Sequence, residues 1–527
     1  MTPFSRLMDA LVLTPARNAK LRLLQDYFAA APDPDRGWAL AAITGGLDLK
    51  AVKPALLRAL VAERVDAELF ALSYDYVGDL AETIALIWPE TGADPVARSL
   101  GEVVDELSTI SKAEAPARIT NLLDTMPAAE RYALIKLATG GMRMGVSARL
   151  AKQALANFGD VPVEEIEEIW HGLEPPFEPL FQWLEGGEKP VSAARAPFRP
   201  VMLATAFEER DQTTYEPRDY AAEWKWDGIR VQAVAEGGVR RLYTRTGEDI
   251  SATFGDLLDE MDFEAALDGE LLVRRGGEIG SFGDLQQRLN RKRVPKAMLT
   301  EYPACLRAYD ILRHGEEDPR PLPYDQRRAR LRDLLSGLPP DRFDLSDEVA
   351  FDDWAMLDAM RAAPPHKAIE GVMLKRRDAP YQGGRPRGPW FKWKRDPYLI
   401  DAVLMYAQRG HGKRSSFYSD YTFGVWTEDG SLTPVGKAYF GFTDEELKQI
   451  DKFVRAHTID RFGPVRAVTA NRDEGLVLEV AFEGLNRSTR HKSGVAMRFP
   501  RISRLRWDKP PHQADHLASL QAMLADG

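Results

Sequence analysis

The stretch of sequence that decides the fold reads Glu223-Trp224-Lys225-Trp226-Asp227-Gly228-Ile229-Arg230. Strict alternation before the Asp-Gly pair predicts a β-strand that ends in a tight hairpin turn. Because side chains alternate across a strand, Glu223, Lys225 and Asp227 share one face, and both tryptophans point the other way. A charged row backed by aromatic residues is typical of a pocket wall. The position of Lys225 in this row makes it a candidate nucleophile that accepts a nucleotide.

A lysine amine attacks a nucleotide phosphate only when it is neutral, although lysine normally titrates near pH ~10.4. Carboxylates at 223 and 227 would favour the charged amine, whereas Arg230, a divalent cation or further lysines would favour the neutral one. The stretch Trp390-Phe391-Lys392-Trp393-Lys394 supplies such lysines. Alternation puts Lys392 and Lys394 on one strand face, from which we expect them to hold a phosphate. Taken alone, each stretch also fits an amphipathic strand with solvated charges.

Two acids fit the same scheme. Glu270 and Glu370 each stand beside a glycine inside an otherwise apolar, strand-like run. An acid is costly to bury without a partner, so a bound cation or a ribose hydroxyl is the expected reason for each. An ordinary acid on an edge strand is the alternative.

The charge is unevenly distributed along the 527 residues. The net charge of −10 argues against a protein that coats nucleic acid. However, residues 375–395 contain eight Lys/Arg and one Asp, and residues 481–510 contain eight Lys/Arg and two acids. One isolated basic run usually indicates a solvated face. Two such runs together with the Lys225 stretch favour phosphate binding.

Several classes of protein are excluded by composition. A single cysteine, Cys305, leaves no disulfide framework and no Cys-rich zinc site, and the eight histidines show no ligand spacing. No apolar stretch approaches the roughly 20 residues of a membrane span, and the first residues do not resemble a secretion signal. No Gly-x-x-x-x-Gly-Lys-Ser/Thr run occurs, so nucleotide binding of the P-loop type is not expected. We expect a cytoplasmic protein that does not bind a membrane.

The chain is long enough for two to four domains. Residues 4–170 have helical periodicity, clearest at 20–28 and 131–138, and a glycine-containing turn at 140–147 either approaches a phosphate or simply connects two helices. A Gly/Pro/Ala-rich linker follows at 186–200. From 221 onward short alternating runs indicate an α+β domain with helices near 282–291 and 325–335. Beyond Pro397 more short strands and one helix at 445–456 fit a small β-barrel.

Together these residues identify a resemblance to the ATP-dependent DNA ligases, in the three-domain form with an N-terminal helical DNA-binding domain. The family's motifs are matched in order by Lys225-Trp226-Asp227-Gly228-Ile229-Arg230, Thr244-Arg245-Thr246-Gly247, Leu267-Asp268-Gly269-Glu270, Ala308-Tyr309-Asp310, Glu370-Gly371-Val372-Met373, Trp390-Phe391-Lys392-Trp393-Lys394 and Met497-Arg498-Phe499-Pro500-Arg501, which continues to Lys509. The resemblance spans nearly the whole chain. It implies an all-α DNA-binding domain at 1–190, an α+β nucleotidyltransferase (adenylation) domain at 200–397, an OB-fold β-barrel at 398–512 and a tail at 513–527.

The resemblance also implies a role for each matched residue. Lys225 would form the covalent lysyl-adenylate. The nucleotide would be contacted by Glu223 at the adenine, Tyr309 stacked on its face, Arg230 and Arg245 at ribose and phosphate groups, Lys392 and Lys394 at the AMP phosphate, and Arg498 and Lys509 at the triphosphate. Glu270 and Glu370 would bind ribose or Mg²⁺. Arg385 falls where the family often has a nucleotide-contacting arginine, although an extra proline leaves its register open.

The implied activity is the sealing of nicks in duplex DNA with ATP as co-substrate and Mg²⁺. Adenylate would pass from Lys225 to the 5′-phosphate at the nick, and AMP would leave when the 3′-hydroxyl attacks. The expected protein is a monomer near the nucleoid. The alternatives are an RNA ligase or capping enzyme, which the long helical N-terminal region disfavours, an NAD-dependent DNA ligase, which would carry a four-cysteine zinc module, and a non-catalytic nucleic-acid clamp, which the intact Lys225 disfavours.

Overall fold

The structure is a computed structural model that describes residues 1–47, 49, 52–142, 144–191, 195–289, 291, 294–409, 418–489 and 491–525. The chain forms two compact units, one of Met1–Val161, Pro175–Lys189 and Pro397–Gly527, the other of Pro162–Glu174 and Pro190–Asp396. Over the described residues, no helix is both long and apolar enough to cross a membrane.

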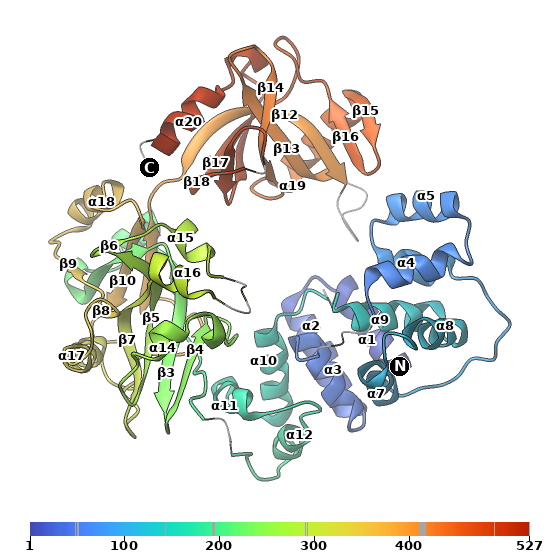
Figure 1. Cartoon of the computed structure of the whole chain (residues 1–527), viewed down its shortest axis with the longest axis horizontal. Coiled ribbons are helices and arrows are strands. Elements are labelled where there is room, and N and C mark those ends of the chain that lie inside the picture. The colour runs from blue at the N-terminus through green and yellow to red at the C-terminus, as the bar shows by residue number, and fades with distance from the viewer. Residues whose placement is uncertain are drawn as a thin grey trace. The chain divides into compact units, whose positions relative to one another are not determined.

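The N-terminal region consists of helices (Figure 1). They are α1 (Thr2–Leu13), α2 (Arg17–Ala30), α3 (Asp35–Thr44), α4 (Pro54–Ala62), α5 (Ala67–Val77), α6 (Leu80–Ile87), α7 (Leu100–Thr109), α8 (Ala115–Thr125), α9 (Ala128–Thr139), α10 (Ala148–Gly159), α11 (Val163–Ile169), η1 (Trp170–Gly172) and α12 (Glu178–Leu184). Both helices predicted from periodicity are confirmed as α2 and α9. The turn predicted at 140–147 connects α9 to α10, and Arg143 within it lies outside the described residues.

The central region mixes strands with short helices. Its elements are β1 (Thr205–Ala206), α13 (Glu209–Gln212), η2 (Pro217–Asp219), β2 (Tyr220–Trp226), β3 (Ile229–Glu236), β4 (Val239–Thr244), η3 (Ser251–Thr253), α14 (Gly255–Leu258), β5 (Ala265–Arg275), β6 (Glu278–Ile279), α15 (Phe282–Gln286), α16 (Lys296–Glu301), β7 (Ala304–His314), α17 (Tyr324–Leu335), β8 (Phe343–Leu345), β9 (Glu348–Val349), α18 (Trp354–Ala362), β10 (Ile369–Arg376) and β11 (Trp390–Lys394). The helix predicted at 325–335 is confirmed as α17, and the one predicted near 282–291 is shorter, as α15.

Two sheets divide these strands. One has the order β1-β11-β10-β2-β9, and the other has the order β4-β3-β5-β7-β8 with β6 attached to β5. The predicted hairpin at Asp227-Gly228 is therefore wrong, because β2 and β3 belong to different sheets. The Asp-Gly pair instead carries the chain from one sheet to the other. Alternation on a strand predicts which side chains share a face, but it does not predict the partner strand.

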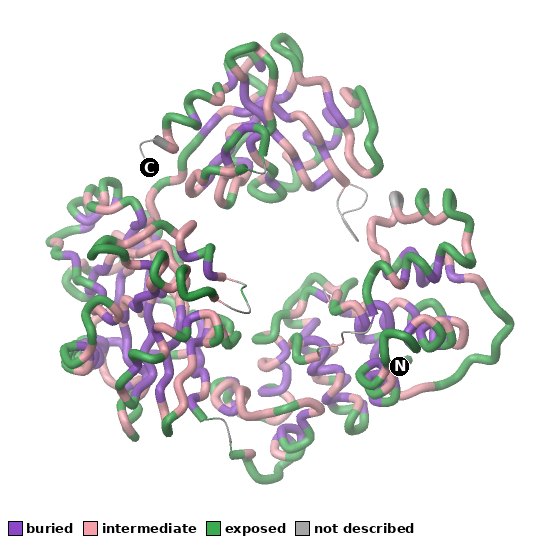
Figure 2. The backbone as a smooth tube through the Cα atoms, in the orientation of Figure 1, coloured by how far each residue is buried: buried purple, intermediate pink, exposed green. Residues whose placement is uncertain are grey.

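Each sheet has its own buried core. Phe254, Leu267, Leu306 and Leu331 belong to the core of the second sheet, which α14 and α17 help to form. Aromatic side chains, including Trp354 of α18, fill the core of the first. Figure 2 shows the buried segments running along the strands of this unit. A third core, which includes Val234 of β3 and Trp390 of β11, packs the two sheets together.

The C-terminal region is rich in strands. Its elements are β12 (Tyr398–Arg409), β13 (Tyr418–Trp426), β14 (Leu432–Ala438), α19 (Asp444–Ala456), β15 (Thr458–Phe462), β16 (Val465–Val468), β17 (Val477–Phe482), β18 (Gly484–Arg487), β19 (Val495–Arg498), β20 (Arg501–Arg506), η5 (Pro511–Gln513) and α20 (Leu517–Ala525). A row of strands β14-β13-β12-β16-β15 is joined by β17 and β20, and β18 pairs with β19. The predicted strand-rich domain is confirmed. Within the described part of the chain, no pairing joins the ends of the row, so the barrel is not closed.

The predicted fold class of three regions, helical, α+β and strand-rich, is confirmed. The boundaries at 190, 200, 397 and 512 stay a proposal. Residues 162–174, within the predicted helical domain, pack with the central unit. There Glu168 pairs with Arg320 at 3.0 Å, and His171 lies 5.1 Å from the ring of Phe198.

Candidate active site

Lys225 lies near the end of β2, directly opposite Gly371 of β10. Its ammonium makes an ion pair with Oε1 of Glu370. Lys394 of β11 lies 3.0 Å from Oε2 of the same carboxylate. Two lysines from two strands therefore share one acid, and their side chains are 22% and 34% exposed, so a ligand can reach them.

A glycine beside Glu370 permits this approach of β10 to β11. Gly371 has φ +150°, and a Cβ built there would lie 2.3 Å from the carbonyl oxygen of Trp393. The register between β10 and β2 shifts between Ile369 and Gly371. The Glu-Gly pair singled out in the sequence therefore marks an irregularity that turns the carboxylate of Glu370 toward the lysines.

The second sheet brings Glu270 to the same place. Glu270 of β5 stands opposite Arg230 of β3. Burial raises the pKa of Glu270 to about 8, and the negative charge of Glu370 adds to this effect while Lys225 opposes it. At Gly228 a Cβ would lie 2.9 Å from Cγ of Glu270, so the turn between the sheets passes close to this acid.

Positive charge gathers around the lysines. Burial lowers the pKa of Lys392, and the neighbouring charges of Lys394, Lys225 and Arg385 lower it further. Burial alone would raise the pKa of Glu370, but the charges of Lys225 and Lys394 lower it. Arg385, whose register was open in the sequence, thus lies close enough to act electrostatically on Lys392. Such a concentration of cations suits phosphate oxygens.

Arg230 makes a bidentate contact with Asp268. Its Nε and Nη2 atoms lie 3.0 and 2.6 Å from the two carboxylate oxygens, and the hydroxyl of Tyr381 donates to Asp268 at 2.6 Å. Asp268 is fully buried. The guanidinium is also 5.9 Å from the ring centre of Tyr309. Arg230 is therefore fixed beside Tyr309 by its pairing with Asp268.

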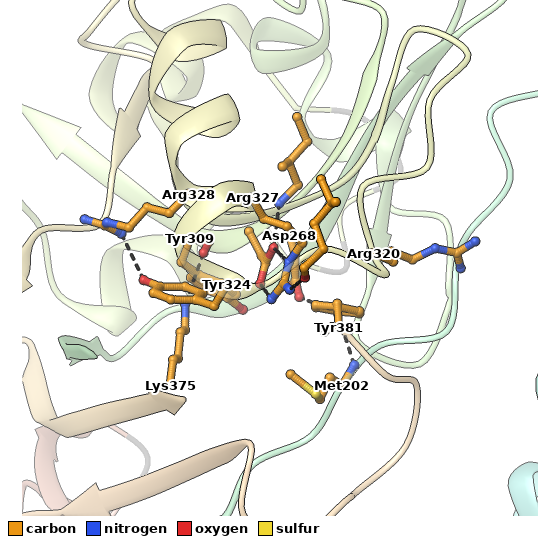
Figure 3. A network of polar contacts seen from close by, with 12 residues as sticks. Met202, Asp268, Tyr309, Arg320, Tyr324, Arg327, Arg328, Lys375 and Tyr381 are labelled. Atoms are coloured by element: carbon orange, nitrogen blue, oxygen red, sulfur yellow. Dashed lines mark hydrogen bonds and ion pairs between the residues drawn. The ribbon is translucent and has the colours of Figure 1, made fainter. Parts of the chain in front are cut away.

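Glu223 is 1% exposed and belongs to a buried polar network. Its partners Tyr324, Arg328 and Lys375 are labelled in Figure 3. Its Oε1 accepts hydrogen bonds from Lys375 at 2.9 Å, from the hydroxyl of Tyr324 and from Arg328 at 3.4 Å. Lys375 also lies 4.3 Å from the ring centre of Tyr309. The residues predicted for the adenine, Glu223 and Tyr309, are thus linked through Lys375.

Sequence reasoning missed Lys375, Tyr324 and Arg328 as site residues. Lys375 follows an apolar run at a position in phase with Gly371 and opposite Ala221 of β2, and this period-two phase could have placed it on the site's face. Tyr324 and Arg328 are one turn apart on α17, so they share a helix face. Nothing in their local sequence indicates which strand that face covers.

Three further predicted residues are not on the strands that carry this cluster. Arg245 is exposed in the turn after β4. Arg498, at the end of β19, and Lys509, after β20, belong to the other compact unit. In that unit Lys509 donates to Asp401 at 2.6 Å, and Arg498 lies 5.8 Å from the ring centre of Phe499. Their predicted contact with a triphosphate stays a prediction.

The acids of the site suit a magnesium ion that also binds phosphate. Over the described residues, no group of three or more His, Cys, Asp or Glu side chains forms a complete cage for a metal. Mg²⁺ usually binds one or two carboxylates together with substrate phosphates and waters. Glu270 and Glu370, which interact electrostatically across the two sheets, fit that ligand set.

Three family models match the chain. Residues 201–394 match "ATP dependent DNA ligase domain", residues 414–509 match "ATP dependent DNA ligase C terminal region", and residues 2–156 match "DNA ligase N terminus". All the clustered site residues lie within the first match. The three matches follow the order of the three regions of the fold.

Individual relatives agree with these matches. The chain is 32% identical over 475 residues to a "Probable DNA ligase" of Koribacter versatilis, covering 84% of this chain and 81% of the relative. It is 31% identical over 440 residues to "DNA ligase 1" of Korarchaeum cryptofilum, covering 79% and 77%. The solved structure "Pmar-Lig_PreS3" is 14% identical, covers 95% of this chain and 99% of its own, and has a TM-score of 0.60, which shows a shared fold.

Proposed function

This chain belongs to the ATP-dependent DNA ligase family, and from that premise we propose that it seals nicks in duplex DNA through an AMP adduct on Lys225. The observation that carries the proposal is the contact of Lys225 and Lys394 with opposite oxygens of Glu370. This arrangement supplies a nucleophile, an acceptor for its proton and a cation for the phosphate within one group of side chains.

In the first step Nζ of Lys225 attacks the α-phosphorus of ATP. A nitrogen–phosphorus bond forms, the bond from the α-phosphorus to the bridging oxygen breaks, and pyrophosphate leaves with that electron pair. The attacking ammonium must first lose a proton, and the carboxylate of Glu370 is already in contact with it. Lys392 and Lys394 would stabilise the charge that builds on the α-phosphate oxygens.

Once the Lys225 proton has passed through Glu370 to solvent, Mg²⁺ held by Glu270 and Glu370 together with phosphate oxygens would neutralise charge on the triphosphate. When ATP and the metal enter, Lys225 has to exchange its ion pair with Glu370 for the substrate. The side chains involved are partly exposed, which makes this exchange physically accessible.

In the second step an oxygen of the 5′-phosphate at the nick attacks the phosphorus of the bound AMP, so a pyrophosphate bond forms as the lysine–phosphorus bond breaks and the Lys225 amine is released. In the third step the 3′-hydroxyl attacks the activated 5′-phosphorus, so the phosphodiester forms and AMP leaves. Basic residues of the N-terminal and C-terminal regions would hold the duplex mainly through its phosphates, which makes binding independent of sequence and sensitive to salt. We propose that the protein acts as a monomer in the cytoplasm, at the nucleoid.

A sealing assay tests this proposal. A duplex with one 5′-phosphorylated nick is incubated with the protein, Mg²⁺ and either ATP or NAD, and an RNA duplex with a nick serves as the alternative substrate. We expect sealing of DNA with ATP, its loss in Lys225→Ala, and normal sealing by Lys296→Ala, an exposed lysine of the same unit. Sealing that requires NAD, or that prefers RNA, would refute the proposal.

A further inference from the structure

Glu223 is surrounded by buried hydrogen-bond donors. Three donors from two elements, Tyr324 and Arg328 of α17 and Lys375 of β10, meet the same carboxylate oxygen, Oε1. We call these three residues the Glu223 clamp. All are buried, with side chains at most 5% exposed where they pair with Glu223. Replacing such a buried ionic group with apolar residues is often neutral or stabilising, so the clamp indicates a function beyond packing.

Each member of the clamp is itself fixed. Arg328 donates to the hydroxyl of Tyr324 at 3.2 Å and to the carbonyl of Ser346 at 2.6 Å. Lys375 donates to the carbonyl of Tyr309 at 3.1 Å. Burial raises the pKa of the Tyr324 hydroxyl well above its ordinary value, and the nearby carboxylate of Glu223 raises it further. Tyr324 therefore keeps its proton at neutral pH and donates it to Glu223.

The clamp adjoins Tyr309, the ring that we expect from the sequence to stack on the adenine. The ammonium of Lys375 lies 4.3, 4.7 and 5.3 Å from the ring centres of Tyr309, Trp390 and Tyr324, so aromatic faces surround it. Figure 3 shows Lys375 and Arg328 directed toward the tyrosines. Because all three donors use Oε1, they orient the carboxylate without using Oε2.

A carboxylate fixed in this way distinguishes purines by hydrogen-bond polarity. The amino group at position 6 of adenine is a donor, whereas the oxygen at position 6 of guanine is an acceptor and meets a fixed acceptor unfavourably. Lys375 already donates to Glu223 and to the carbonyl of Tyr309, and these two contacts fix the position of its ammonium. Leaving a buried polar group unpaired is costly, and sites built on such pairing discriminate strongly.

We propose that Tyr324 and Arg328 of α17 are positioning residues that select adenine, by holding Glu223 as an acceptor and Lys375 away from the base. They act through Glu223 and do not themselves need to touch the nucleotide. The inference rests on the proposed function, since it assumes that ATP is bound beside Lys225. It adds that α17 sets the selectivity of the site for the base.

Self-adenylation with two nucleotides tests this inference. ATP is compared with purine riboside triphosphate, which lacks only the 6-amino group, and GTP is measured alongside. For Tyr324→Phe and Arg328→Lys we expect kcat/KM for ATP to fall about tenfold, mostly through a higher KM. The kcat/KM of each variant for purine riboside triphosphate should stay within about threefold of that of the unaltered protein. The preference of ATP over GTP should also narrow by about tenfold. The matched control, Arg332→Met, changes an exposed arginine on the same helix. It should leave the ratios of kcat/KM between the three nucleotides unchanged.

The ratio between nucleotides separates positioning from stability, because partial unfolding lowers activity with every nucleotide alike. If ATP and purine riboside triphosphate lose activity in proportion in both variants, or if neither variant changes the ratio, the inference is refuted. Failure of the parent protein to take label from ATP would instead refute the proposed function.

Discussion

Glu223 and Lys225 stand two residues apart on one face of β2, yet their surroundings differ. Glu223 is 1% exposed and its partners are themselves held by other groups. Lys225 is 22% exposed, and its partner Glu370 is shared with Lys394. The contacts around Glu223, in the middle of β2, are fixed, whereas the ion pair of Lys225, near the end of β2, can be exchanged. Recognition needs a rigid acceptor, whereas group transfer needs a nucleophile that can leave its ion pair.

The largest effect should follow from Glu370→Gln, which removes the charge that both lysines share. We expect adenylation to slow by roughly 10²–10⁴-fold, the range typical for loss of a group that transfers a proton in the transition state. The rate of label transfer from α-labelled ATP measures it. Glu278→Gln, an exposed glutamate of β6, should have no effect. A fall in the adenylation rate of less than about threefold in Glu370→Gln would show that the reaction of Lys225 does not depend on this acid.

The buried pair of Glu223 and Lys375 should contribute to the free energy of unfolding. Lys375→Met leaves the Glu223 carboxylate buried without its ammonium partner, and breaking a buried pair in this way costs about 3–5 kcal/mol. Lys394→Met removes a partly exposed partner of Glu370, and we expect a loss below about 1 kcal/mol. Denaturant unfolding followed by tryptophan fluorescence measures both. Equal losses of unfolding free energy in the two variants would contradict the contrast between the surroundings of Glu223 and those of Lys225.

A smaller effect is expected from Arg498→Ala in the C-terminal unit. If Arg498 engages the triphosphate, adenylation by ATP should fall about tenfold, whereas sealing of a nick that already carries AMP should fall less than threefold. Single-turnover rates of the two reactions provide the test. Arg487→Ala, at an exposed position of β18, is the matched control. An equal fall in both reactions would indicate a general role in DNA binding.

The smallest expected effect is the pH dependence of the Mg²⁺ concentration that the reaction requires. Burial raises the pKa of Glu270 to about 8, so its carboxyl carries a proton at neutral pH in the free protein. A cation binds the deprotonated form, so the half-saturating Mg²⁺ concentration should fall as pH rises toward 8 and become constant above it. Glu270→Gln should remove this dependence. A flat profile in the unaltered protein would assign Glu270 to the ribose.

Much of the site could be predicted because its chemistry is local in sequence. Alternation placed Glu223 with Lys225, and Lys392 with Lys394, on common faces, and all four belong to the central unit. The acids beside glycines were identifiable because burying a charge in an apolar strand demands a reason.

The remainder depends on long-range pairing. The hairpin predicted after Asp227 is wrong because the partner of a strand is decided by the whole sheet. Tyr324 and Arg328 reach Glu223 across about a hundred residues of sequence, as separations of 101 and 105 positions show. No local pattern specifies which helix covers β2. Such contacts become visible only when the two sheets and α17 are assembled.

Identifying the labelled residue tests the central claim most directly. The protein is incubated with α-labelled ATP and Mg²⁺, digested, and the adduct is located by peptide mass spectrometry. We predict a single AMP group linked through phosphorus to Nζ of Lys225, pyrophosphate released in equal amount, and no label on Lys225→Ala. AMP on a different side chain, or undiminished labelling of Lys225→Ala, would contradict the account.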